Sequence, residues 1–278
     1  MSPLVIALAL AAAICNASWN AVLRSGGDRL QFVTVMSFAT TVAALPLMWL
    51  LPAPAPACWP YLGVSALLQV MYSFLLAHAY RHGELGQIYP IVRGCVPTLV
   101  TLGGFVLAGQ RLGGVALCGV ALISAAILSL AIHGGRGQHK PLALAVLAAL
   151  CAAAFITTDA LGVRLAGGPQ SYAAWIWVIY GLLMPAGLAL ARGKVVLDLG
   201  RRDTAKALVG GLLSFGSYGA IIAALALGNA GAVSALRETG IAFSVLIGRL
   251  FLGETLTVRR VLVCLTVMLG AVCIGYAG

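Results

Sequence analysis

Long apolar stretches, separated by short clusters of charge, constrain this chain more than any other feature. Residues 115–132, for example, are apolar on every face of a helix. Across the chain 62% of the residues are hydrophobic and 9% are charged, whereas soluble proteins carry roughly a quarter charged residues. A water-soluble domain is therefore excluded, and the lipid bilayer is the solvent for most of the surface.

The apolar stretches are expected to be helices rather than strands of a β-barrel, because barrel strands are segments of about ten residues with alternating polarity. At about 20 apolar residues per helix, the chain has room for roughly ten crossings and for no separate soluble domain. Charges, prolines and glycines divide it accordingly. We predict an all-α integral membrane protein with ten transmembrane helices at residues 3–23, 30–51, 59–80, 87–107, 112–132, 141–165, 171–191, 205–227, 231–252 and 257–277.

The first apolar run is expected to remain as a span and not to be removed as a signal peptide. No Lys or Arg precedes it, and it continues through Asn16, Trp19 and Asn20 without a cleavage site. The seven cysteines are scattered, with no Cys-x-x-Cys pair or Cys/His cluster. We interpret them as packing residues and expect neither a metal nor a cofactor.

Lys and Arg near the span ends predict the orientation, because cytoplasmic connections carry an excess of them. The even-numbered connections hold only Arg111 and Arg164. The odd-numbered connections hold twelve such residues: Arg24, Arg29, Arg81, Arg136, Lys140, Arg192, Lys194, Arg201, Arg202, Lys206, Arg259 and Arg260. We therefore expect the odd connections in the cytoplasm and both termini outside, in the plasma (bacterial inner) membrane. The net charge of +10 then reflects topology, so no nucleic-acid partner is expected.

The two halves of the chain match at a nearly constant offset. Gly-Glu-Leu-Gly at residues 83–86 matches Gly-Asn-Ala-Gly at residues 228–231, and Arg93 falls on Arg237 at an offset of 144. We predict two five-helix repeats, residues 1–135 and 136–278. Because five is odd, the second copy is inverted, an architecture typical of transporters with a substrate site near the midplane. A duplicated structural bundle without transport is the alternative.

Sequences around these glycines resemble a known family. Ala-Tyr-Arg-His-Gly-Glu-Leu-Gly-Gln-Ile-Tyr-Pro-Ile-Val-Arg-Gly at residues 79–94, followed by Gly-Gln-Arg-Leu at 109–112, resembles the end of an EamA repeat of the drug/metabolite transporter superfamily. Ser-Ala-Leu-Arg-Glu-Thr at 234–239, with Leu-Gly-Glu-Thr-Leu at 252–256, resembles the same region of the second repeat. The resemblance implies a ten-helix secondary carrier. Many members export amino acids or metabolites, and others carry sugar phosphates or nucleotide sugars. Many are drawn with both termini in the cytoplasm, the reverse of what the charges predict here.

Two arginines inside spans are candidates for binding an anion. A charge at a helix centre costs roughly 2.5–3.5 kcal/mol on insertion scales, so it is expected to face a partner or a watery cavity. Inversion places Arg93 and Arg237 at similar depths from opposite faces, where they could bracket a carboxylate, phosphate or phosphonate. The structural alternative has Arg237 held by Glu238 or another carboxylate, and Arg93 held by carbonyls at a helix end.

The two spans that carry these arginines are each expected to present one inward face, which in the span at 87–107 carries Pro90, Arg93, Pro97, Thr101 and Gly104. Pro90 and Pro97 should interrupt the span at 87–107, because proline lacks an N–H and Pro97 frees the carbonyl of Arg93. The span at 231–252 is expected to be one helix with a single inward face. That face would carry Ser234, Arg237, Gly240, Ser244 and Gly248.

Other polar and aromatic side chains in the spans complete the predicted substrate site. Trp and Tyr rings would provide apolar walls, while amides and hydroxyls would bind the ligand. The alternative is that the polar groups are interhelical hydrogen bonds, worth under about 1 kcal/mol each. The predicted residues are Asn16, Trp19, Asn20, Gln69, Tyr72, Tyr89, Ser214, Ser217 and Tyr218.

Two acids are candidates for proton coupling. Asp159 is the only carboxylate within residues 141–165 and is the counterpart of Asn20 at an offset of 139. Burial favours the protonated form of an acid, so Asp159 and Glu238 suit a proton-coupled carrier. Asp159 could instead pair with Arg24 or Arg164, and Glu238 could form a fixed ion pair beside Arg237.

We therefore predict a secondary active transporter, an exporter, of a small polar anionic or zwitterionic metabolite such as an amino acid. A flippase for a lipid-linked anionic head group is the alternative. An enzyme is not expected, because His-Glu-x-x-His and Gly-x-Ser-x-Gly are absent. The chain also lacks a phosphate-binding loop sequence that would drive transport by ATP. The sequence leaves a homodimer open.

The charge count makes a testable prediction about orientation. Single cysteines introduced between Gly193 and Thr204 of a cysteine-free variant should resist a membrane-impermeant thiol reagent in whole cells and react after permeabilisation. Rapid labelling of intact cells would reverse the assigned orientation.

Overall fold

The computed structural model describes residues 1–24, 29–82, 85–130, 139–193, 200–251 and 257–276, which contain α-helices and no strand. A short 3-10 turn, η1 (Pro56–Cys58), precedes α3. The helices are α1 (Pro3–Arg24), α2 (Arg29–Leu50), α3 (Trp59–His82), α4 (Leu85–Ala108), α5 (Gly114–Ser129), α6 (His139–Leu165), α7 (Pro169–Arg192), α8 (Arg201–Leu227), α9 (Ala230–Arg237), α10 (Gly240–Phe251) and α11 (Val258–Tyr276).

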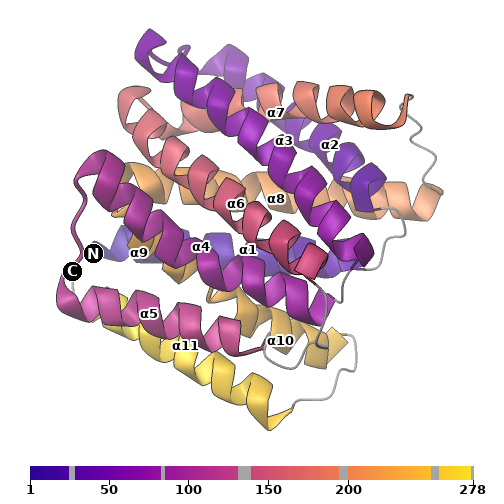
Figure 1. The fold of residues 1–278 in the computed structure, drawn as a ribbon. Helices are drawn as coiled ribbons and strands as arrows, with labels where there is room; N and C mark the ends of the chain where they lie inside the picture. The colour runs from indigo at the N-terminus through magenta and orange to yellow at the C-terminus, as the bar shows by residue number, and fades with distance from the viewer. Residues whose placement is uncertain (25–28, 83–84, 131–138, 194–199, 252–256, 277–278) are drawn as a thin grey trace.

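The predicted all-α membrane fold is confirmed. Eight described helices are long and apolar enough to cross a membrane, α5 is a shorter apolar helix, and α9 and α10 together make the remaining segment. Figure 1 shows both chain ends at the same end of the bundle.

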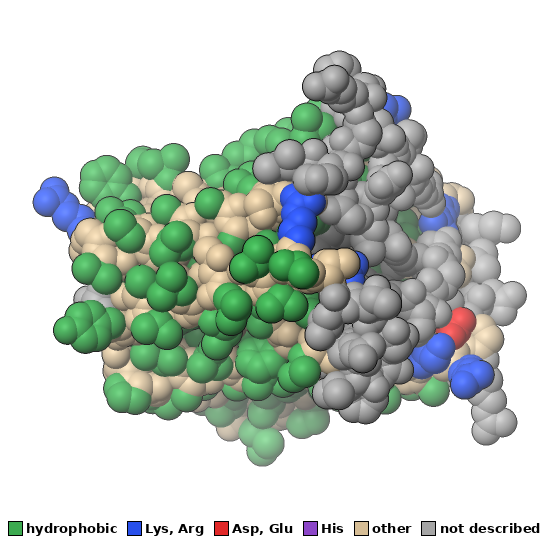
Figure 2. Space-filling model, turned by 90° about the horizontal axis from the view of Figure 1, so that it is seen from below, with side chains coloured by type: hydrophobic (Ala, Val, Ile, Leu, Met, Phe, Trp, Pro, Cys, Tyr) green, Lys and Arg blue, Asp and Glu red, His purple; other side chains and the backbone are tan. Residues whose placement is uncertain are grey.

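Large hydrophobic side chains face outward, including Val42 at 65% exposure and Leu190 at 89%. On the face in Figure 2 they cover much of the described surface, as contact with lipid tails requires.

The main helix contacts between the two halves are those that a twofold axis requires: a contact made by a helix is repeated by its counterpart in the other repeat. α1 packs against α8, and its counterpart α6 packs against α3. α4 packs against α6, while α9 and α10 pack against α1. Three pairs join a helix to its own counterpart: α2 with α7, α4 with α9, and α5 with α11. This exchange supports the inverted repeat. The division at 135/136 lies outside the described residues and stays a prediction.

The interrupted span is in the second repeat, so the predicted positions of helix breaks were wrong. α4 is continuous through Pro90 and Pro97, because a proline removes one hydrogen bond and the protein can satisfy the freed carbonyl. The expected single helix at 231–252 instead stops at Arg237 and resumes at Gly240.

Tight turns and a close contact accompany this break. Glu238 N donates to the Ala235 carbonyl at 3.0 Å and Thr239 N to the Leu236 carbonyl at 3.1 Å, the i to i+3 pattern of a tightened turn. A Cβ on Gly240 would lie 3.0 Å from the carbonyl oxygen of Ala13 in α1. Glycine therefore lets the break lie directly against the α1 backbone.

Glycines also bring whole helices together. A Cβ on Gly211 in α8 would lie 2.6 Å from Cβ of Ala39 and 2.7 Å from the carbonyl oxygen of Met36, both in α2. Close approach through small residues is how membrane helices gain van der Waals packing when both partners are equally apolar.

We expect Gly211→Ala to lower the thermal unfolding temperature in detergent, because overpacking costs roughly 1–3 kcal/mol. Gly216→Ala in the same helix is the matched control, since a Cβ there meets nothing within 4 Å. That control should gain up to about 1 kcal/mol of helix propensity. Equal stability of the two variants would contradict the close α2–α8 contact.

Candidate functional site

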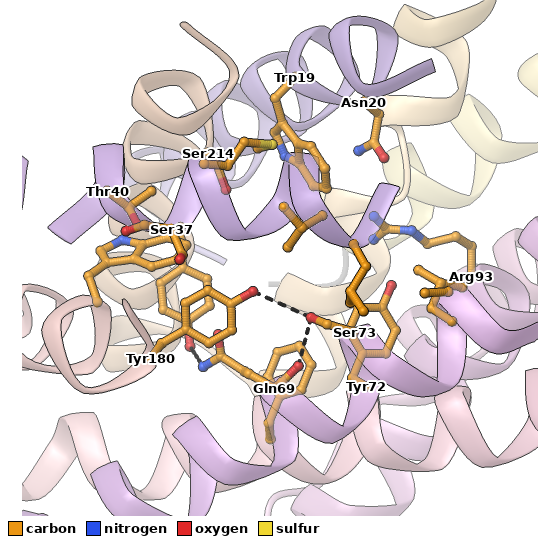
Figure 3. Close-up of a pocket in the computed structure, with 18 of the residues that line it drawn as sticks. Trp19, Asn20, Ser37, Thr40, Gln69, Tyr72, Ser73, Arg93, Tyr180 and Ser214 are labelled. Atoms are coloured by element: carbon orange, nitrogen blue, oxygen red, sulfur yellow. Dashed lines mark hydrogen bonds between the residues drawn. The ribbon is translucent and has the colours of Figure 1, made fainter. Parts of the chain in front are cut away.

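A cavity of about 160 Å³ lies where the two halves meet. Residues from α1, α2, α3, α4, α6, α7, α8 and α9 line it, and Figure 3 shows polar groups and aromatic rings around it. Many of the residues predicted from sequence are brought together here. They are Trp19, Asn20, Gln69, Tyr72, Arg93, Ser214, Tyr218 and Arg237.

The cavity is displaced toward the end of the bundle that carries the odd-numbered connections. Trp19 and Asn20 lie in the last turns of α1, Leu30 and Val33 in the first turns of α2, and Ala77 in the last turns of α3. The chain termini are at the opposite end. The cavity therefore approaches one membrane face more closely than the other.

Both predicted arginines line the cavity and reach one acceptor, Asn16 Oδ1, just outside the lining. Arg93 Nη2 donates to Asn16 Oδ1 at 3.5 Å, and Arg237 Nη2 donates to the same oxygen at 3.3 Å. Arg93 Nη1 also pairs with Glu238 Oε1 at 3.3 Å. In the structural alternative Glu238 would hold Arg237; among the described residues Glu238 instead pairs with Arg93, which joins α4 to the end of α9.

The cluster of Arg93, Arg237, Asn16 and Glu238 holds two cations and one carboxylate. Asn16 is 4% exposed and Glu238 5%, so water screens these charges weakly. Arg237 lies in the last turn of α9, where the helix dipole favours a cation. The cluster thus presents an excess of positive charge to the cavity.

Asp159 lies behind the cavity wall rather than on it. It is completely buried, and its Oδ1 accepts from the Tyr172 hydroxyl at 2.9 Å while its Oδ2 accepts from the Tyr218 hydroxyl. Gln69 Nε2 in turn donates to the Tyr218 hydroxyl at 2.8 Å. Because Tyr218 and Gln69 line the cavity, a short hydrogen-bonded chain joins the carboxylate to the cavity.

The basic partners considered for Asp159 do not contact it among the described side chains. Arg164 donates instead to the carbonyls of Gly228 at 2.6 Å and Leu225 at 3.5 Å, at the end of α8. The side chain of Arg24 lies outside the described residues. Two phenol donors, rather than a cation, therefore hold the Asp159 carboxylate.

Comparison with known proteins agrees with this architecture. Residues 139–276 match the model of the EamA-like transporter family. The chain belongs to this family. A solved crystal structure superposes on the chain with a TM-score of 0.79 at 14% identity, covering 98% of this chain and 97% of its own, and this likeness shows the fold. No curated protein matches the chain in sequence.

Some predicted residues of this EamA-like transporter do not line the cavity. Ser217 is buried and donates to the Ala12 carbonyl at 2.8 Å, which joins α8 to α1 and fits the hydrogen-bonding alternative. Asn16 contacts the arginines from just outside the lining. The side chain of Tyr89 lies outside the described residues.

Sequence reasoning missed the contribution of α2 and α7. Ser37, Thr40, Trp177 and Tyr180 all line the cavity, yet neither helix contains a charge in its middle. In α2, the spacing of Thr34, Ser37 and Thr41 by three and four residues could have indicated a polar face.

Proposed function

We propose that this EamA-like transporter is a secondary active exporter of a small polar metabolite with an anionic group, either an anion or a zwitterion. One observation carries the proposal. Guanidinium groups from equivalent helices of the two repeats converge on Asn16 Oδ1 at the central cavity.

The charge balance and the size of the cavity support an anionic ligand. Arg93 has a carboxylate partner, whereas the described partner of Arg237 is the neutral Asn16. An anion that displaced Asn16 Oδ1 would give Arg237 a charged partner in a weakly screened site, where charge-assisted hydrogen bonds are strongest. The volume of about 160 Å³ is below the roughly 300–1,000 Å³ of pockets for drug-sized ligands, which favours a small metabolite.

The position of the cavity supports loading from the cytoplasm. It lies toward the odd-numbered connections, which the charge count assigns to the cytoplasmic side of the plasma membrane. Substrate would enter at that face, and both termini would be outside.

Asp159 supports proton coupling through its chain to the cavity. As a carboxylate it accepts from both tyrosines, whereas a protonated Asp159 must donate one hydrogen bond itself. Protonation would therefore rearrange the hydrogen bonds of Asp159, in which Tyr218, a wall of the cavity, takes part. Glu238 is the weaker coupling candidate, because its pair with Arg93 fits a fixed ion pair.

Arg237→Met should weaken binding of the best-stabilising anion from a thermal-shift screen of carboxylates, phosphates and phosphonates. We expect roughly a tenfold to hundredfold loss, as for a hydrogen bond between charged groups. Arg111→Met is the matched control, because Arg111 is exposed in the connection between α4 and α5. Equal affinities of the two variants would remove the basis for an anionic substrate.

The role of Arg93 is tested with a double variant, because Arg93→Ala alone leaves the buried carboxylate of Glu238 without its partner. Arg93→Ala combined with Glu238→Gln should remain folded and fail to transport, while Arg93→Lys should recover transport only in part because ammonium lacks the planar fork. Lipid scrambling in place of soluble anion transport would favour the flippase.

Asp159→Asn should abolish accumulation driven by a proton gradient in proteoliposomes and preserve substrate exchange, because an amide of the same shape cannot take up and release the proton. Asp203→Asn is the matched control, since it neutralises an acid that pairs with Lys206 in the first turns of α8 and does not line the cavity. An Asp159→Asn protein that still concentrates substrate on an imposed proton gradient would exclude Asp159 from coupling.

A further inference from the structure

Apolar packing separates the cavity from the end of the bundle that carries the chain termini. α9 packs against α1 and α4, and Figure 1 shows it near both termini. Side chains of one hydrophobic cluster fill the space between these three helices, each at most 2% exposed and none of them part of the cavity lining: Val5, Val100, Ala230 and Val233. The cavity is therefore closed toward the termini by the start of α9.

Two polar side chains from other elements hold the turn between α8 and α9. Gln110 Oε1, in the connection after α4, accepts from Ala230 N at 3.0 Å. Arg164, in the last turn of α6, donates to the carbonyls of Gly228 at 2.6 Å and Leu225 at 3.5 Å. Both bond to groups that a helix end leaves without an internal partner, and a cation is favoured at the carboxyl end of α8.

These two contacts differ from the local cap of α9. Asn229 Oδ1 accepts from Gly231 N at 3.0 Å and Ala232 N at 3.4 Å, and this cap would move with the helix. The bonds of Gln110 and Arg164 join the turn to other elements, so they break if α9 moves. The bond from Arg164 to the turn is exposed, so water can replace it. The closure at this end is thus of a kind that can be released.

α9 is also separate from the helix that follows it. It contains eight residues and ends at Arg237, and α10 begins only at Gly240. Arg237 lines the cavity and donates to Asn16 of α1 at 3.3 Å, while Ala230 at the other end of α9 is held by Gln110. One short helix therefore connects the proposed anion site with the closed end of the bundle.

We propose that α9 is the gate at the terminus end of the cavity, and that Gln110 and Arg164 are the latch that keeps it closed. A carrier releases its substrate at the end opposite to the one where it loads, so it needs a second conformation. In that conformation the start of α9 leaves the apolar packing and both latch contacts break. An anion that displaced Asn16 from Arg237 would free the inner end of α9 from α1, so substrate binding favours opening. The inference rests on the proposed transport function, but the latch depends on no particular substrate.

The test measures how fast single cysteines react with a water-soluble maleimide, in cysteine-free full-length protein purified in detergent. Ser234→Cys reports on the gate. Ser234 lies one turn from Arg237 toward the start of α9, is 2% exposed and is not part of the cavity lining. It should react slowly in otherwise wild-type protein, whereas Ala77→Cys, which lines the cavity near the other end, should react fast. Equal rates would show that the terminus end is not closed and would overturn the proposal.

Removing a latch side chain should open the gate more often. Arg164→Met should accelerate labelling of Ser234→Cys roughly two- to tenfold, the range for one hydrogen bond. Arg111→Met is the matched control, because Arg111 is an exposed arginine in the connection between α4 and α5. Gln110→Leu should also accelerate labelling, whereas Gln110→Glu should not, because a carboxylate still accepts from the N-terminus of α9.

A buried native cysteine separates gating from general loosening of the fold. Cys58 is completely buried, and as the only cysteine of the protein it should stay unreactive when Arg164→Met is introduced. Faster labelling of Cys58 would show that Arg164 holds the fold as a whole, and the latch would be wrong. Equal labelling of Ser234→Cys in Arg164→Met and Arg111→Met protein would also overturn it. Neither result would change the proposed anion site, which the affinity of Arg237→Met protein for anions tests separately.

Discussion

Charge buried inside a lipid-surrounded bundle must be balanced by the protein itself, and this requirement organises the centre of the molecule. Arg93 and Arg237 meet at Asn16, and Glu238 pairs with Arg93, so α4 and α1 of the first repeat are tied to α9 of the second. No lipid could supply those partners at this depth. The interactions that balance these charges within the membrane therefore also join the two repeats. Among the described residues of the cluster, they leave a net positive charge beside the cavity.

The second buried charge is separated from this cluster but not isolated from it. Asp159 contacts the cavity through Tyr218, and Gln69 continues the chain into the lining. The proposed anion site and Asp159 therefore lie on opposite sides of one wall. At the end of the bundle that carries the termini, Gln110 Oε1 accepts from Ala230 N at 3.0 Å and Arg164 holds the Gly228 carbonyl. These contacts fasten the start of α9 while the cavity lies toward the other end.

The sequence predicted the features that depend on composition and duplication, and it failed where tertiary contacts decide. Hydropathy located the spans, and the 144-residue offset paired Arg93 with Arg237. The helix break was misplaced, because proline removes one hydrogen bond locally whereas Gly240 permits a contact with α1 that local rules do not describe. Trp177 was missed for a related reason, since an indole in an apolar run looks like packing until a cavity is seen beside it.

The break between α9 and α10 also decides how the two arginines differ. Successive helical residues point about 100° apart, so Glu238 does not follow Arg237 but turns toward α4, where it meets Arg93. Inversion gives the arginines equivalent depths, yet one receives a carboxylate and the other shares a neutral amide. An exact duplicate would have given both the same partner. Divergence around one helix break thus leaves Arg93 paired with a carboxylate and Arg237 with a neutral amide among the described residues, and under the proposed function Arg237 is the guanidinium that would gain most from an incoming anion.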